Sequence, residues 1–450
     1  MMFSGIVVKK TSMYKHIAAA GLLFLLVVNV METYGNPFFD IDVRGMLHFE
    51  KFGMFFNSIA IAATLIFVLL SGRDVENIGK NTSDLFALIF FVICGIGILT
   101  SFSTLLMLFL GIEIISIPLY ILTGSDKRNL KSNEAALKYF LMGSFSTGIM
   151  LMGIAFLYGT SGTFNIELPP RQSFMGPALV SDFVKIGLIL ILVSMAFKVS
   201  AAPFHFWTPD VYDGAPSVFT SFMATIVKAA IFISFIRLFD ARSADIGEGW
   251  QIVIALIIIA TLFVGNITAI FQQSVKRMLA YSSIAQAGFM MFALYTSNQF
   301  SREGILLYSV AYSLATIGIF AILIKMKDVT FEGFNGLGKS HPVLAATNTV
   351  FLLSLVGIPL TAGFWAKYYM LASVVKTQSS LWLVIVAVLF AAVSVYYYFR
   401  VIQAMYFKES NEVVAIEPVK SSFSIGLILL AAAIVVFGVM PNWLLHWFYF

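Results

Sequence analysis

Apolar stretches of about 20 residues recur along the whole chain, and a helix of that length crosses the hydrocarbon core of a bilayer. Of the 450 residues, 60% are hydrophobic and only 11% are charged. A soluble domain carries roughly 25% charged residues. The apolar side chains exceed what one globular core could hide, so the sequence predicts an all-α polytopic protein whose solvent is the lipid bilayer, with no soluble domain attached.

Charged residues, glycines and prolines divide the apolar sequence into about thirteen candidate transmembrane helices. An odd number of spans places the two termini on opposite sides of the membrane. The predicted spans are 16–32, 52–71, 84–101, 103–123, 134–159, 180–208, 216–238, 249–270, 277–296, 303–325, 341–375, 381–407 and 422–446.

Lysines and arginines between the spans predict the orientation, because cytoplasmic loops carry an excess of them. With the N-terminus inside, sixteen are cytoplasmic, namely Lys9, Lys10, Lys15, Arg73, Lys80, Lys127, Arg128, Lys131, Lys276, Arg277, Lys325, Lys327, Lys339, Arg400, Lys408 and Lys420. Seven are outside, namely Arg44, Lys51, Arg171, Arg237, Arg242, Arg302 and Lys376. We therefore expect a cytoplasmic N-terminus and an external C-terminus. The same bias explains the positive net charge without a nucleic-acid partner.

Four charged residues remain deep inside predicted spans: Glu113, Lys198, Lys228 and Lys367. A lysine costs roughly 2.5–3.5 kcal/mol at the bilayer centre on insertion scales, so such residues face the bundle interior or a water-filled path. Burial favours the neutral amine and a nearby carboxylate favours the ammonium, so a row of interacting lysines can pass protons along. The alternative is a set of ion pairs that only fix helix packing.

Two of these lysines accompany predicted breaks in their helices. Lys198 precedes Pro203, which has no N–H to donate, and Lys367 follows Pro359, which leaves the Leu355 carbonyl free. The span 341–375 would be about 52 Å long if wholly helical, which exceeds the bilayer core. Broken helices at membrane depth mark ion and substrate sites in transporters, and a proline kink used only for packing is the alternative.

The two breaks lie five spans apart, which predicts two five-helix repeats, each with a broken helix. An odd number of helices per repeat inverts one repeat relative to the other. The predicted divisions are 1–83 for the N-terminal helices, 84–240 for the first repeat, 249–407 for the second, and 408–450 for the C-terminal helix.

Two polar residues near the first break leave alternatives open. His205 sits past the break at the inner side of the predicted path, where an imidazole could relay protons near neutral pH or be purely structural. Lys138 stands four residues after Glu134, an ordinary i,i+4 ion pair, so the residues alone favour a structural role.

Nucleotide and metal sites are not expected in this chain. GFNGLGKS, residues 333–340, fits the phosphate-binding pattern G-x-x-x-x-G-K-S, but that loop needs a preceding strand, and here an apolar helix precedes it. Cys94 is the single cysteine and lies in an apolar run, and the five histidines show no metal-ligand spacing.

Five stretches closely resemble the antiporter-like membrane subunits of respiratory complex I. They are AFKVSAAPFHFWTPDVYDGAP, VKRMLAYSSIAQAGFM, SLVGIPLTAGFWAKYYM, LGIEIISIPLYIL and EAALKYFLMGSFSTG. The resemblance covers nearly the whole chain from about residue 84 onward, and WTPDVYDGAP and Lys367 resemble the N-type members rather than the L and M types. The bacterial family usually has fourteen spans, and the one missing here is the first.

The resemblance implies a proton-translocating subunit of NADH:quinone oxidoreductase with no cofactor of its own. It makes Glu113 the acid paired with Lys198, Lys228 the central bridge, Lys367 the second-half lysine, and Lys138 a further relay residue. NADH, FMN, iron–sulfur clusters and quinone would belong to partner subunits. M-like and K-like membrane subunits would be the neighbours, in the bacterial inner membrane. A subunit of a multisubunit sodium/proton antiporter and a non-conducting structural subunit remain the alternatives.

Overall fold

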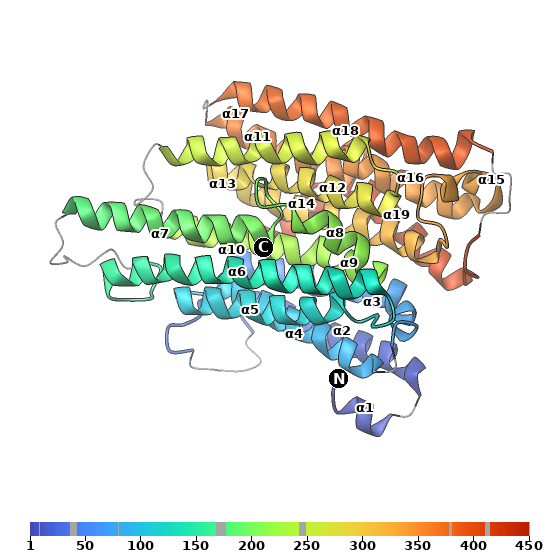
Figure 1. Cartoon of the computed structure of the whole chain (residues 1–450), viewed down its shortest axis with the longest axis horizontal. Coiled ribbons are helices and arrows are strands. Elements are labelled where there is room, and N and C mark those ends of the chain that lie inside the picture. Colours follow the sequence, from blue (N-terminus) through green and yellow to red (C-terminus); the bar gives the residue numbers. More distant parts are fainter. Residues whose placement is uncertain are drawn as a thin grey trace.

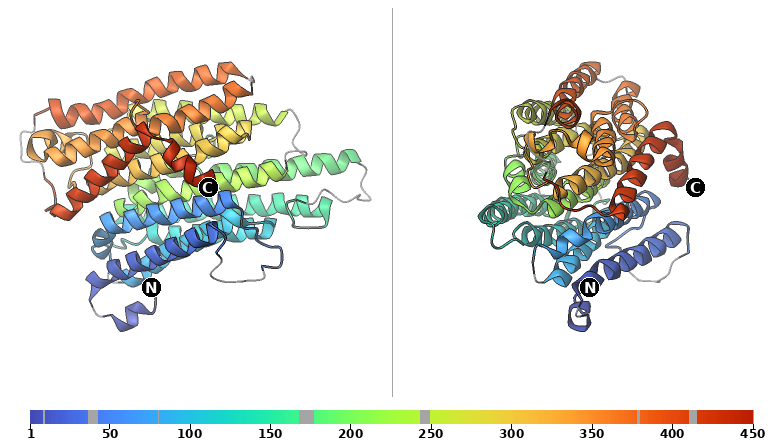
Figure 2. Two further views of the ribbon diagram at one scale, coloured as in Figure 1. Left: turned by 180° about the vertical axis from the view of Figure 1, so that it is seen from behind. Right: turned by 90° about the vertical axis from the view of Figure 1, so that its right-hand side faces the viewer.

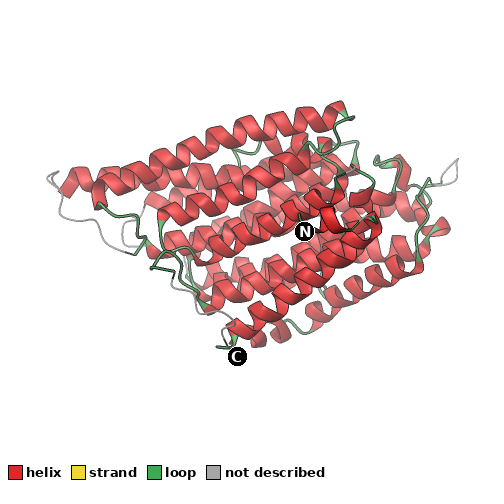
Figure 3. Ribbon diagram, turned by 90° about the horizontal axis from the view of Figure 1, so that it is seen from below, coloured by secondary structure: helices red, strands yellow, loops and turns green. Residues whose placement is uncertain are grey.

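The computed structural model describes residues 1–8, 10–36, 43–79, 81–167, 177–242, 249–377, 380–409 and 415–449. Lys9, Lys80 and Arg171, which entered the charge count, lie outside the described residues. Within the described part, every regular element is a helix, as Figure 3 shows. The predicted all-α architecture is confirmed.

The first half of the chain forms the elements up to residue 241. They are α1 (Ser4–Val7), the 3-10 helix η1 (Thr11–Met13), α2 (Tyr14–Thr33), α3 (Lys51–Glu76), α4 (Thr82–Ser101), α5 (Leu105–Thr123), α6 (Leu130–Ser161), α7 (Pro177–Lys198), α8 (Trp207–Gly214), α9 (Ser217–Phe222), the π-helical turn η2 (Met223–Val227) and α10 (Lys228–Ala241).

The second half begins at residue 249 and ends with a short C-terminal helix. Its elements are α11 (Gly249–Ile270), α12 (Val275–Met290), α13 (Phe292–Thr296), α14 (Gln299–Lys325), the 3-10 helix η4 (Glu332–Phe334), α15 (Leu337–Ser340), α16 (Pro342–Val356), α17 (Ala362–Lys376), α18 (Leu381–Phe407), α19 (Ser421–Val439) and α20 (Asn442–Tyr449).

Twelve helical spans in the described part are long and apolar enough to cross a membrane. The shorter apolar helix α16 and its successor α17 together form one broken span, which brings the total to the thirteen predicted spans. One predicted boundary is wrong. The last span ends at Val439 rather than near residue 446, because Pro441 has no N–H with which to continue the helix, and α20 follows as a separate helix.

The spans lie side by side with roughly parallel axes (Figure 1). Helices α2–α5 lie on one side of the bundle and α18 on the other, with α9, α10, α12 and α14 between them, and the end-on view in Figure 2 agrees with this order. Helix α19 runs back across the bundle and packs on α14, α16 and α17. The spans formed by α9–α10, α12–α13 and α14 are almost wholly buried, so polar groups on them are shielded from lipid.

Small residues bring α11 and α12 into close contact. A Cβ atom on Gly265 would lie 2.5 Å from the backbone nitrogen of Ala285, and one on Gly288 would lie 2.9 Å from Leu262. In membranes, where lipid is as apolar as the side chains, such close backbone approach is a main source of helix association. It fixes α12, which carries the central polar residues of the candidate site.

Ion pairs group the helix ends into two opposite faces of the bundle. Arg237, near the end of α10, lies 3.1 Å from Glu50 at the start of α3 and donates to the Phe102 carbonyl at 2.6 Å. At the other end of α3, Asp74 pairs with Lys325 at the end of α14. The charge count predicts the same grouping, with Arg237 on one side of the membrane and Lys325 on the other.

Candidate functional site

The three lysines predicted to lie deep inside the spans are buried in the helix bundle. Lys198, Lys228 and Lys367 are 9%, 2% and 8% exposed. Among the described residues, no carboxylate oxygen lies within 4.0 Å of any of these three amines. A buried amine needs hydrogen-bond acceptors to offset its lost hydration. Each of the three finds them in hydroxyl or backbone carbonyl oxygens.

Lys198 is bound by two hydroxyls of α5. Its Nζ donates to Ser116 Oγ at 2.9 Å and to Tyr120 Oη at 3.3 Å. Glu113 lies one turn before Ser116 on the same helix, is half-buried, and accepts a hydrogen bond from Thr147 Oγ1 at 2.8 Å. The predicted direct ion pair of Glu113 with Lys198 is therefore not formed, because the two hydroxyls occupy the positions next to the amine.

The first broken helix is interrupted more widely than a proline kink would require. Helix α7 ends at Lys198, and α8 begins only at Trp207. Ser200 adopts a φ of 66°, in the left-handed region, so the helix ends before Pro203 is reached. The Trp207 indole N–H donates to the Phe197 carbonyl at 2.9 Å and thereby satisfies one acceptor at the broken end. The predicted break is confirmed.

The second break exposes backbone acceptors that Lys367 then uses. Helix α16 ends at Val356, three residues before Pro359, and Gly357 has a φ of 89°. Lys367 Nζ donates to the carbonyls of Leu355 at 2.9 Å and Val356 at 2.8 Å. The carbonyl end of a helix attracts a cation, which explains how a lysine is held there without a carboxylate. The predicted availability of the Leu355 carbonyl is confirmed.

Lys228 lies at the centre of the bundle, where α10 follows the π-helical turn η2. Its Nζ donates to the Ser283 carbonyl at 2.7 Å and to Ser283 Oγ at 3.1 Å. Turns of this kind are rare and occur often at functional sites. Both acceptors belong to α12.

Gln286 connects the central lysine to the second broken helix. It stands one turn after Ser283, the residue that binds Lys228. Its Nε2 donates to the Leu355 carbonyl at 3.0 Å, and this is the oxygen that also binds Lys367. Polar contacts therefore lead from α10 to Ser283 on α12, and from Gln286, one turn further along α12, to the end of α16. We refer to this set of contacts as the polar link.

The sequence alone did not single out the residues of this link. Buried hydroxyls surround Gln286: its Nε2 also donates to Tyr398 Oη at 3.2 Å, and the Tyr308 hydroxyl donates to its Oε1. For Ser282, Ser283 and Gln286, the usable signal is that three polar side chains stand close together on an otherwise apolar segment of α12. Tyr308 on α14 and Tyr398 on α18 were also missed, and no signal of this kind marks them.

Known proteins resemble this chain both in sequence and in the arrangement of their helices. Residues 103–394 match the family described as NADH:quinone oxidoreductase/Mrp antiporter, TM. The chain is 39% identical to the NADH-quinone oxidoreductase subunit N of Cytophaga hutchinsonii over 429 residues, which cover 94% of this chain and 92% of that protein. The chain belongs to the NADH:quinone oxidoreductase/Mrp antiporter family.

Solved structures of the NADH:quinone oxidoreductase/Mrp antiporter family agree with this assignment. A chain of respiratory complex I from Thermus thermophilus with bound aureothin is 31% identical, with a TM-score of 0.83 over 98% of this chain and 94% of that one. A chain of the Mrp complex from Dietzia sp. is 16% identical, with a TM-score of 0.84 over 99% and 93%. The second likeness shows the fold alone, whereas the resemblance to subunit N extends to the sequence.

His205 lies inside the first break of this family member. Its ring is buried and lies 4.4 Å from the ring of Phe206, and its Nδ1 finds no hydrogen-bond partner among the described residues. No hydrogen bond in the described part joins it to Lys198. Its proposed role as a relay stays a prediction.

Lys138 lies near the bundle surface rather than among the buried lysines. Its Nζ is 2.8 Å from Glu134, which confirms the i,i+4 pair, and 2.8 Å from Asp210 on α8, with 41% of the lysine side chain exposed. Asp210 also accepts from Arg277 Nη2 at 3.0 Å, so the cluster joins α6, α8 and α12 around a pocket of about 220 Å³. Burial raises the pKa of the Asp210 carboxyl, but its hydrogen bonds to Lys138 and Arg277 outweigh burial and hold that pKa below its usual value.

The segment that mimics a phosphate-binding loop has the wrong local structure for one. Residues 333–340 form the end of η4 and the short helix α15, and no strand precedes them in the described part. Lys339 pairs with Glu409 at 3.1 Å across the exposed surface. The described residues also contain no group of three or more His, Cys, Asp or Glu placed to hold a metal ion.

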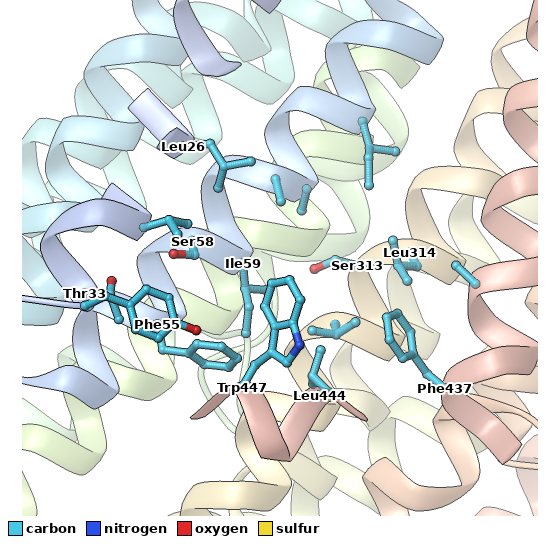
Figure 4. A pocket seen from close by; sticks show the side chains of 17 residues that line it. Leu26, Thr33, Phe55, Ser58, Ile59, Ser313, Leu314, Phe437, Leu444 and Trp447 are labelled. Atoms are coloured by element: carbon cyan, nitrogen blue, oxygen red, sulfur yellow. The ribbon is translucent and has the colours of Figure 1, made fainter. Parts of the chain in front are cut away.

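A larger cavity of about 360 Å³ lies apart from the lysines, between α2, α3, α14, α19 and α20 (Figure 4). Apolar side chains such as Phe55, Leu314 and Trp447 line it, and Ser58 and Ser313 are among its few polar neighbours. None of its lining residues is charged.

Proposed function

We propose that the chain is the subunit N type of proton-translocating membrane subunit of NADH:quinone oxidoreductase in a bacterial inner membrane. The observation that carries the proposal is the buried link from Lys228 through Ser283 and Gln286 to the Leu355 carbonyl and Lys367. Each amine at its two ends can be neutral or protonated, and each change alters the field at the next amine. The remaining members of the proposed path are Glu113, Lys198, Lys138 and His205.

The ion that this row suits is the proton. Alkali and alkaline-earth cations need several oxygen ligands and compensating negative charge. The charged groups of the row are three buried lysines, which repel other cations, and one half-buried acid, Glu113. This chemistry disfavours the alternative of a sodium site in this subunit.

Electron transfer would take place in partner subunits that hold NADH, FMN, iron–sulfur clusters and quinone. Quinone reduction would change the charge at one end of the row, and the Glu113–Ser116–Lys198 group would respond first, since Lys198 is held by neutral hydroxyls. An M-like subunit and a K-like subunit would flank this chain. The excess of lysine and arginine favours a cytoplasmic N-terminus and a periplasmic C-terminus.

Two inverted repeats, 84–240 and 249–407, would frame the row, between the N-terminal helices of 1–83 and the C-terminal helix of 408–450. In support, the spans α7–α8 and α16–α17 are both broken and stand five spans apart. They therefore cross the bundle in opposite directions, as inversion requires.

The test is Lys228→Met in the intact respiratory complex, assayed in inside-out membrane vesicles for NADH-driven proton uptake per quinone reduced. We expect proton uptake to be lost while the complex remains assembled. The matched control is Lys276→Met, because Lys276 is equally buried but binds the Asp213 and Ala215 carbonyls at the end of α8, at 2.9 and 2.6 Å.

The control should lower the stability of the complex and leave its proton-to-electron ratio unchanged. Normal proton uptake by Lys228→Met would instead identify a structural subunit. A requirement for Na⁺ in the wild-type assay would favour the sodium/proton antiporter alternative.

A further inference from the structure

Four fully buried hydroxyl groups lie beside the lysine row without a hydrogen-bond partner among the described residues. They belong to Ser71 on α3, Ser221 on α9, and Tyr312 and Thr316 on α14, and each residue is at most 3% exposed. Proteins rarely leave buried polar groups unsatisfied, and where no protein group completes a hydrogen bond the partner is usually an internal water molecule. Four such hydroxyls in one region therefore indicate internal water positions.

The three helices that carry these hydroxyls pack directly on one another. Helix α9 contacts both α3 and α14, and α3 contacts α14. The Phe67 ring, one turn before Ser71, lies 5.4 Å from the ring of Phe222, which follows Ser221. Thr316 stands one turn after Tyr312 on α14. The four hydroxyls are therefore carried by three helices that pack directly on one another, and we refer to Ser71, Ser221, Tyr312 and Thr316 together as the seam.

The deep end of this seam reaches the central lysine. The Tyr312 hydroxyl is within interaction range of the hydroxyls of Thr316 and Ser283, although none of the described groups completes a hydrogen bond to it. Ser283 is the residue that binds Lys228. Tyr312 also lines a small cavity of about 10 Å³, which Gln286 and Lys367 line as well. Space for about one water needs a volume of this size.

The outer end of the seam meets an ion pair that leads to solvent. Asp74 stands one turn after Ser71 on α3 and pairs with Lys325, which also lies 3.6 Å from Glu417. The exposed fractions of the Asp74, Lys325 and Glu417 side chains are 7%, 14% and 47%. The charged groups therefore form a graded path from water into the bundle, on the face that the charge count assigns to the cytoplasm.

We propose that the seam of Ser71, Ser221, Thr316 and Tyr312 is the cytoplasmic proton inlet of this subunit, entered at the Asp74–Lys325 pair and ending at Lys228. This inference rests on the proposed function and adds the route by which Lys228 is reprotonated. Protons move by hops along hydrogen-bonded water molecules and hydroxyl groups. Each oxygen accepts one proton from the oxygen before it and passes another proton to the oxygen after it, so no electron or cofactor is required. The route is separate from the Lys138–Asp210–Arg277 cluster, which lies between α6, α8 and α12.

The experiment compares isosteric variants of the intact respiratory complex in inside-out vesicles, at equal complex content. The double variant Ser221→Ala/Thr316→Val replaces two water-holding hydroxyls by apolar groups of similar size. We expect its NADH-driven proton uptake to fall about tenfold, the effect of ~1.4 kcal/mol on a rate-limiting barrier. Thr316→Ser keeps the hydroxyl and should pump at nearly the wild-type rate.

Matched controls remove buried hydroxyls that already have partners in two of the same spans. Thr64 on α3 donates to the Ala60 carbonyl at 2.8 Å, and Ser234 on α10 donates to the Ile231 carbonyl at 2.8 Å. Thr64→Val and Ser234→Ala should pump at nearly the wild-type rate. If the double variant pumps as well as these controls, the inlet is overturned, whatever the outcome for Lys228.

The comparison with Lys228→Met separates this inference from the proposed function. Loss of proton uptake in Lys228→Met together with normal uptake in the double variant rejects only the inlet. Normal uptake in Lys228→Met rejects the proposed function and the inlet together. Should the double variant fail to assemble, the two single variants Thr316→Val and Thr316→Ser are compared instead. Thr316→Ser keeps the hydroxyl and Thr316→Val lacks it, so equal proton uptake in the two variants would overturn the inlet.

Discussion

Lys367 binds the Leu355 carbonyl at 2.9 Å and so fills an acceptor that the break in its own span sets free. Gln286 donates to the same oxygen at 3.0 Å. The broken helix therefore serves two purposes. It stabilises a buried amine without a counter-ion, and its Leu355 carbonyl oxygen binds both the Lys367 amine and the Gln286 side chain of α12. Pro359, four residues after Leu355, has no N–H to donate to this carbonyl.

Replacing Gln286 should interrupt transfer between the two buried lysines. Gln286→Leu keeps the approximate volume but removes the hydrogen bonds to Leu355 and Tyr398. We expect proton uptake per quinone to fall about tenfold, measured in vesicles. Gln272→Leu is the control, because the one hydrogen bond that the structure gives for the Gln272 side chain goes to the Thr268 carbonyl of the preceding helix, at 3.0 Å. Equal effects of the two substitutions would argue against a link through Gln286.

The two hydroxyls that bind Lys198 should differ in importance. Ser116 Oγ is the closer acceptor at 2.9 Å, and Tyr120 Oη lies at 3.3 Å. A lost hydrogen bond to a buried polar group costs about 1–3 kcal/mol, so Ser116→Ala should impair coupled turnover more than Tyr120→Phe. Steady-state NADH:quinone activity of both variants measures the order. The reverse order would mean that the tyrosine is the main acceptor.

Glycine at position 363 should be required for the second break. A Cβ there would lie 1.8 Å from the Ser354 carbonyl oxygen, so the backbone of α16 would have to move. Overpacking of this kind costs about 1–3 kcal/mol or more, and Gly363→Ala should reduce the amount of assembled complex on native gels. Gly148→Ala is the control, because nothing lies within 4 Å of its Cβ position. Reduced assembly in both variants would not support a specific constraint at the break.

The cluster around Asp210 should contribute a small stability that depends on pH. Burial raises the pKa of Asp210, and its hydrogen bonds to Lys138 and Arg277 reverse that effect and leave the pKa below its usual value. The stabilisation is then complete above the unfolded pKa of about 3.9 and is lost as pH falls through the lower folded value. Because the pairs are partly exposed, each contributes only about 0.2–1 kcal/mol.

Asp210→Asn should accordingly lower the melting temperature of the solubilised complex at neutral pH. The difference from the wild type should shrink as pH falls below about 4. A difference that stays constant in acid would mean that the ionised carboxylate is not the source of the stabilisation.

Much of the fold could be predicted from the sequence because lipid imposes one rule on every span. Twenty apolar residues and a charged or glycine-rich end are visible without tertiary information, and the break near Pro359 follows from its missing N–H. The end of the last span at Val439 was missed, because the apolar pattern continues into α20 past Pro441.

The site was only partly predictable, because partners of a buried amine are set by packing. Sequence reasoning expects a carboxylate beside Lys198, but the bundle places Ser116 and Tyr120 there and leaves Glu113 one turn away. Serine and glutamine on an apolar helix carry too weak a signal to show that Gln286 meets the end of α16. That contact depends on how α12 and α16 pack in the bundle, which the sequence does not reveal.

Substituting arginine for Lys228 tests most directly whether this lysine gives up its proton during turnover. Lys228→Arg keeps a positive charge at the centre of the bundle but cannot deprotonate near neutral pH. The measurement is the number of protons translocated per NADH oxidised, in vesicles that contain the assembled complex. We predict that translocation is lost although the charge remains. A wild-type proton-to-NADH ratio in Lys228→Arg would contradict proton transfer through Lys228.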